Sequence, residues 1–125
     1  MEKLSANNPS PLAILKATYQ KIGTAKSPAL CGNLVSFSNV GLNHLFYKNS
    51  VPRPRKESHR RFALLRYAKE ILEGRQATVA YREKLIGNSI VHFGAFSAFI
   101  DRQKIKVVVS RIDDGKKQFL SIMND

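Results

Sequence analysis

Residues 77–124 read ATVAYREKLIGNSIVHFGAFSAFIDRQKIKVVVSRIDDGKKQFLSIMN, and this stretch decides the fold of the 125-residue chain. It contains four runs rich in β-branched and aromatic residues, which favour strands: Ala77–Lys84, Ser89–Ile100, Lys104–Ile112 and Lys117–Asn124. Short segments with glycine, asparagine or aspartate, the residues typical of tight turns, separate the runs. Four strands joined by short turns predict an antiparallel meander.

The N-terminal part of the chain predicts one helix and a linker. Ser10 as cap and Pro11 at the first helical position predict a helix that ends by Gly23. Residues 23–33, GTAKSPALCGN, contain two glycines and a proline among small polar side chains, a composition typical of a linker. We therefore expect residues 1–32 to be an N-terminal helix and linker, separate from the domain that follows.

Residues 33–125 form the predicted working domain. It begins with a short extended run, Leu34–Phe37, after which Ser38 or Asn39 can cap a helix. The apolar residues of this helix lie on one face: Leu42, Leu45 and Phe46. Gly41 weakens the helix, because glycine has a low helix propensity.

A longer helix is predicted from Glu57 or Ser58 to Glu73, with Gly74 as its terminator. Its apolar residues form one stripe: Leu64, Leu65, Ala68, Ile71 and Leu72. Helices first and hairpins second indicate an α+β domain, in which the N-terminal helices pack on one face of the four-stranded antiparallel meander.

The excess of basic residues indicates the class of partner. Lys and Arg number 21 against 9 Asp and Glu, so the chain carries +12 at pH 7, with a pI near 10.2. Such a charge attracts polyanions, nucleic acid first, although an acidic protein or an anionic membrane surface would fit the same charge. No apolar run approaches the roughly 20 residues that cross a bilayer, and the first residues lack the order of a signal peptide. We expect no membrane span.

Metals and cofactors are not expected. The one cysteine, Cys31, and three histidines form no cluster with metal-ligand spacing. The phosphate-binding and dinucleotide-binding glycine motifs and the GxSxG elbow are absent from the sequence. Asp113 and Asp114 lie at a predicted hairpin tip, where aspartates are turn formers. A nuclease built on this chain would work without metal, through attack of the ribose 2′-hydroxyl on its own phosphate.

The densest cluster of charge is residues 51–62, VPRPRKESHRRF. Five cations and His59 accompany a single acid, Glu57: Arg53, Arg55, Lys56, Arg60 and Arg61. The cluster lies in a proline-stiffened loop and at a helix start, where backbone N–H groups and arginine forks bind phosphate. The alternative is a solvated basic surface without a specific ligand.

Arg61 and the histidines are the candidates for chemistry. Arg61 falls in the middle of the apolar stripe of its helix, so its charged group points at the sheet. Arg61 is therefore expected either to form a structural ion pair or to be a site residue. His44 lies on the side of its helix away from the main apolar face. Either His44 or His59 could transfer protons. The alternative is that each is an ordinary surface or core residue, as a lone histidine more often is. Ser121 could bind a phosphate oxygen or merely fill a small polar position, and His92 is expected to be a satisfied strand residue.

The order of these features resembles phage-type members of the barnase, EndoU, colicin and RelE-like (BECR) nuclease superfamily. The resemblance rests on residues 35–45, VSFSNVGLNHL, on Arg60-Arg61 with the apolar residues of their helix, and on the last two strands. It covers roughly residues 33–125 and implies a metal-independent ribonuclease of toxin or effector type. The family's helix histidine would correspond to His44, its helix arginine to Arg60 or Arg61, and its last-strand serine or threonine to Ser121.

The resemblance leaves the family's strand-borne basic residue open, with Arg82, Lys106 and Arg111 as candidates. It implies an RNA substrate, such as tRNA or mRNA, and an acidic immunity or antitoxin protein as partner. It also implies a site of action in the cytoplasm of the producing cell or of a target cell to which the protein is delivered. The alternative function is a non-catalytic basic module that binds nucleic acid or an acidic protein through charge alone.

Overall fold

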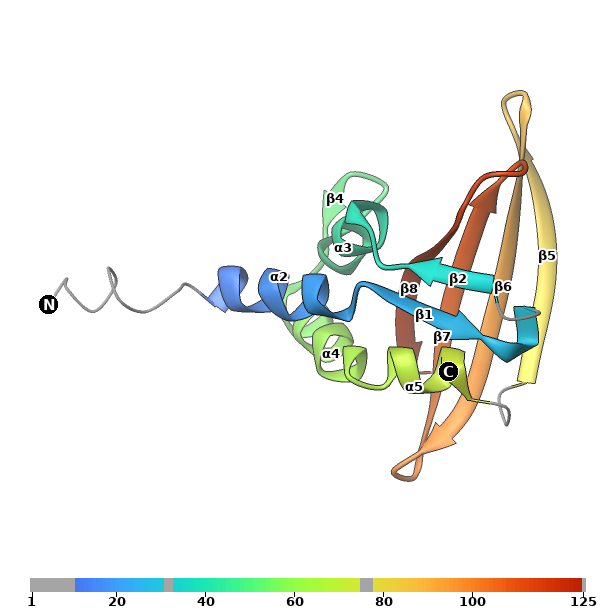
Figure 1. Ribbon diagram of the computed structural model, residues 1–125. Helices are drawn as coiled ribbons and strands as arrows, with labels where there is room; N and C mark the ends of the chain where they lie inside the picture. The colour runs from blue at the N-terminus through green and yellow to red at the C-terminus, as the bar shows by residue number, and fades with distance from the viewer. Residues whose placement is uncertain (1–10, 31–32, 75–77, 125) are drawn as a thin grey trace, which may run out of the picture.

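The computed structural model of the chain describes residues 11–30, 33–74 and 78–124 (Figure 1). It has the predicted α+β class, with the N-terminal helices packed on a mixed sheet that includes an antiparallel meander. Three residues with predicted roles lie outside the described residues: Ser10, Cys31 and Ala77.

The meander agrees closely with the four predicted runs. It consists of β5 (Thr78–Ile86), β6 (Ser89–Ile100), β7 (Gln103–Ile112) and β8 (Lys117–Asn124), each antiparallel to the next. Strands β6 and β8 have the predicted bounds. Asp101 and Arg102 both have positive φ, as a two-residue hairpin turn of type I′ requires.

The sheet is larger than predicted, because the expected linker contributes to it. In the described part of the chain the sheet has six strands, in the order β1-β2-β8-β7-β6-β5. Strand β1 (Thr24–Ser27) pairs antiparallel with β2 (Asn33–Ser36), and β2 pairs parallel with β8. The linker prediction is therefore wrong for β1 and for the 3₁₀ turn η1 (Pro28–Leu30). Buried Ala25 and Ser27 alternate with exposed neighbours in β1. This pattern covers only four residues and lies among turn-forming residues, so the sequence alone does not identify it as a strand.

The helices differ from prediction at one start and one break. Helices α2 (Pro11–Ile22) and α3 (Asn39–Phe46) lie where they were expected, and β3 (Tyr47–Lys48) and β4 (Val51–Pro52) form a small hairpin after α3. The next helix begins at Arg55, earlier than predicted, and is divided into α4 (Arg55–Leu65) and α5 (Ala68–Glu73). Gly74 ends α5 as expected.

Tyr67 explains the break between α4 and α5. Its backbone N–H donates to the Leu64 carbonyl at 2.9 Å, a three-residue spacing that tightens the last turn of α4. Its buried side chain donates a 2.6 Å hydrogen bond from the hydroxyl to Oδ2 of Asp101, in the turn between β6 and β7. The apolar stripe of the sequence continues through this break, so periodicity alone predicts a single helix.

The core joins α2 to the rest of the fold. Tyr19 of α2 is 1% exposed, and its hydroxyl donates to the Ser38 carbonyl at 2.7 Å. Its ring lies against Phe37 and Phe119, which stack with centroids 4.8 Å apart. A Cβ at Gly41 would collide with the Phe119 carbonyl and the Tyr19 hydroxyl, so the glycine that weakens α3 allows the helix to approach β8.

We predict that Gly41→Ala destabilises the fold by about 1–3 kcal/mol, despite the better helix propensity of alanine, because the methyl group overpacks the contact with β8. Urea denaturation measures the loss. Gly94→Ala is the matched control, since its Cβ would meet only the Phe96 ring, at 3.4 Å. Equal stability of the two variants would contradict this account of the α3–β8 contact.

Candidate functional site

Glu57 is the centre of a polar cluster between α3, α4 and β8. Its Oε2 accepts a 2.6 Å hydrogen bond from Nη1 of Arg53 and lies 3.0 Å from Nη2 of Arg61. Nε of Arg61 also donates to this oxygen, at 3.2 Å. The three residues are spaced at intervals of four, so α4 and the residues before it bring two guanidinium groups to one carboxylate.

The Arg53 guanidinium links this centre to His44 on α3. Nε of Arg53 donates to the His44 carbonyl at 2.8 Å, and its Nη2 lies 3.2 Å from His44 Nδ1. A guanidinium can only donate, so Nδ1 accepts and the neutral imidazole carries its hydrogen on Nε2. The Arg53 side chain is 4% exposed, which fixes this geometry in the protein interior.

Burial and neighbouring cations keep His44 neutral. Desolvation lowers the pKa of His44 below its usual 6.5, and the positive charges of Arg53, Arg61 and Lys48 lower it further. Partial burial raises the pKa of Glu57, but the hydrogen bonds and charges of Arg61 and Arg53 outweigh it and hold the pKa below 4.5. At pH 7 the cluster thus contains an uncharged imidazole and an ionised carboxylate.

Arg61 connects the cluster to the sheet. Its Nη1 donates to Ser121 Oγ at 2.7 Å and to the Ile122 carbonyl at 3.1 Å, both on β8. Its side chain is 13% exposed and Ser121 is buried. Of the two interpretations of Arg61, the ion pair with Glu57 is present. Ser121 holds Arg61 in place, so this pair positions α4 on β8.

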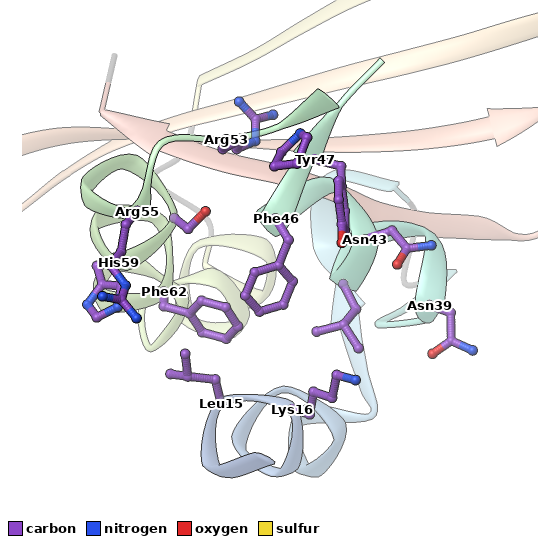
Figure 2. A pocket seen from close by; sticks show the side chains of 13 residues that line it. Leu15, Lys16, Asn39, Asn43, Phe46, Tyr47, Arg53, Arg55, His59 and Phe62 are labelled. Atoms are coloured by element: carbon purple, nitrogen blue, oxygen red, sulfur yellow. The ribbon is translucent and has the colours of Figure 1, made fainter. Parts of the chain in front are cut away.

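Two hollows flank the cluster. A cavity of about 660 Å³ lies between α2, α3 and α4, with Phe46 and Phe62 in its apolar interior and Lys16, Arg55 and His59 at its edge (Figure 2). A shallower hollow of about 420 Å³ is lined by His44, and Asn43 and Tyr47 line both hollows.

The structure brings together three of the five residues predicted as catalytic. His44, Arg61 and Ser121 belong to one chain of contacts that runs through Arg53 and Glu57. His59 does not join it and lies beside Arg55 at the edge of the larger cavity (Figure 2). Arg60 is exposed on α4 and lines a different hollow.

The residues predicted to bind RNA occupy three places. Arg53 is buried in the cluster, and Arg55 and Lys56 are exposed on the first turn of α4. The three candidates on strands lie elsewhere: Arg82 on β5, over the Phe93 ring at 5.0 Å, Lys106 on β7, and Arg111 near the end of β7.

Sequence reasoning missed the role of Glu57. The signal was present, because Arg53, Glu57 and Arg61 recur at intervals of four around the only acid of a basic stretch. The predicted helix starts at Glu57 or Ser58, whereas α4 begins at Arg55. The predicted start leaves Arg53 and Arg55 in a loop, and for that reason the shared carboxylate is not apparent from the sequence.

A scan of protein-family models, a search of curated proteins and a search of solved structures each found no match for this chain.

No helix within the described residues is long and apolar enough to cross a membrane. The same ranges contain no group of three or more His, Cys, Asp or Glu side chains that could hold a metal ion.

The lowered pKa of His44 predicts a loss of stability in mild acid. The unfolded histidine takes up a proton near pH 6.5, whereas the folded one does so only at lower pH. The stabilisation is therefore present above pH 6.5 and is lost as the pH falls through the folded value. We expect His44→Gln to lose less stability than the wild type between pH 7.5 and 5, measured by urea denaturation. Parallel losses in both proteins would show that His44 titrates normally.

Proposed function

We propose that the chain is a metal-independent RNA endonuclease, which leaves 2′,3′-cyclic phosphate and 5′-hydroxyl ends. The observation that carries the proposal is the convergence of a neutral imidazole, an ionised carboxylate and two guanidinium groups in the contacts of His44, Glu57, Arg53 and Arg61. The charge of +12 favours a polyanionic substrate. The order of His helix, Arg helix and meander also agrees with what the resemblance to the BECR nucleases implies.

Substrate approaches along the exposed basic side of α4. Arg55 and Lys56 lie in its first turn, where the helix N-terminus adds to the attraction for phosphate. His59 and Arg60 extend this exposed surface by one more turn. These side chains hold the RNA backbone while the buried guanidinium groups act as fixed positive charge.

The cluster holds a proton-transfer group and a hydrogen-bond donor for this reaction. The Glu57 carboxylate accepts the proton of the 2′-hydroxyl through Oε1, because Oε2 is held by both guanidinium groups. Nε2–H of the neutral His44 donates a hydrogen bond to the departing 5′-oxygen, since Arg53 occupies Nδ1, and the proton that Glu57 accepted passes to that oxygen. Proton transfer by a positioned side chain contributes about 10²- to 10⁴-fold in rate. Arg53 and Arg61 stabilise the negative charge of the phosphorane.

Incubation of the protein with a short RNA in EDTA tests the proposal. We expect cleavage with cyclic-phosphate products, identified by mass spectrometry, and a loss of about 100-fold in rate for His44→Ala and for Glu57→Gln. Lys84→Gln is the control for lost charge, because Lys84 is exposed on β5 and belongs to no candidate site, and it should cleave at nearly the wild-type rate. Absence of cleavage, or equal cleavage by the wild type, His44→Ala and Arg61→Ala, would refute the proposal.

A non-catalytic nucleic-acid-binding module is the second candidate. It is favoured by the engagement of Arg53 and Arg61 in contacts within the protein, while Arg55, Lys56 and Arg60 remain exposed. In that case the same incubation yields steeply salt-dependent binding of RNA without products.

A further inference from the structure

A second basic site lies on the sheet, on the side that faces the core. Strand register places Glu83, His92 and Arg111 in one row across β5, β6 and β7. Lys117 begins β8 beside the end of this row, next to the pairing of Ser110 with Gln118. Arg111 and Lys117 are therefore two cations on neighbouring strands that lie close to one another.

Gly94 opens a cavity in the next row of the sheet. It is paired with Tyr81 on one side and with Val109 on the other, and it has no side chain to fill the space between them. A cavity of about 50 Å³ lies there, and its lining includes Tyr81, Arg111 and Lys117 together with Leu30 of η1. Within the described residues its lining shares no member with the two hollows beside His44.

Arg111, which lines this cavity, also has an unsatisfied donor. Its Nε is buried and has no hydrogen-bond partner, and among the described residues no acid forms an ion pair with it. The acid of its row, Glu83, lies instead 3.0 Å from Nδ1 of His92. A buried guanidinium N–H without an acceptor is unfavourable, and native proteins almost always pair such groups. An anion bound in the cavity would offset the charge of this guanidinium.

We propose that this cavity binds the phosphate group of a phosphate monoester. Its lining includes two cations, Arg111 and Lys117, together with the Tyr81 hydroxyl, which shares a 2.6 Å hydrogen bond with Nδ1 of His92. Two cations suit the double negative charge of a monoester better than the single charge of a chain-internal diester. The small volume admits little beyond the phosphate itself, so the ligand is inorganic phosphate, a nucleotide, or a phosphorylated end of RNA.

Titration with inorganic phosphate, followed by amide NMR at constant ionic strength set with NaCl, tests the site. We expect saturable shifts around Arg111 and Lys117, and an affinity about tenfold weaker or worse in Arg111→Gln. Gly94→Ala narrows the cavity and should also weaken binding. Lys84→Gln removes an exposed charge from the same sheet and should bind as the wild type does.

Two further arms identify the source of the phosphate. Tighter binding of a 5′-phosphorylated oligonucleotide than of its dephosphorylated twin supports a nucleic-acid end, whereas binding of phosphate and mononucleotide alone supports a free ligand. Absence of saturable shifts in the wild type overturns the proposal, as does unchanged affinity in folded Arg111→Gln. If Arg111→Gln does not fold, unchanged affinity in Gly94→Ala overturns it. None of these readouts depends on RNA cleavage.

Discussion

The sharing of one carboxylate by two arginines is the interaction on which the arrangement of this site depends. Glu57 holds Arg53, which reaches α3, and Arg61, which reaches β8, so one acid connects two helices and the sheet. Removal of the carboxylate would leave two nearly buried cations facing one another. In a chain with a charge of +12, the Glu57 carboxylate is therefore needed to hold these two arginines in place, in addition to its proposed role in the reaction.

The same contacts set the chemical state of His44. Arg53 occupies Nδ1 and adds positive charge beside the ring, so a single neighbour fixes both the tautomer and the direction of the pKa. The ring is half-buried and lines an open hollow, which leaves its other nitrogen as the group that can meet a ligand. A histidine prepared in this way is a neutral donor in a positive field, a combination suited to phosphate chemistry.

Sequence patterns predicted the meander well, because alternation and turn residues are local: β6 and β8 have the predicted bounds. They failed where long-range packing decides. Strand β1 forms among linker-like residues because it pairs with β2, and the predicted long helix breaks where Tyr67 reaches Asp101. In the site, helical periodicity placed Arg61 against the sheet, but its contact with Ser121 spans 60 residues of sequence and could only be guessed.

The protonation state of His44 tests the central claim most directly. Nitrogen-15 NMR of the imidazole at pH 7 distinguishes the two neutral tautomers from the imidazolium. The account predicts a neutral ring with its hydrogen on Nε2 and an unprotonated Nδ1 facing Arg53. A hydrogen on Nδ1, or a charged ring at pH 7, would contradict it.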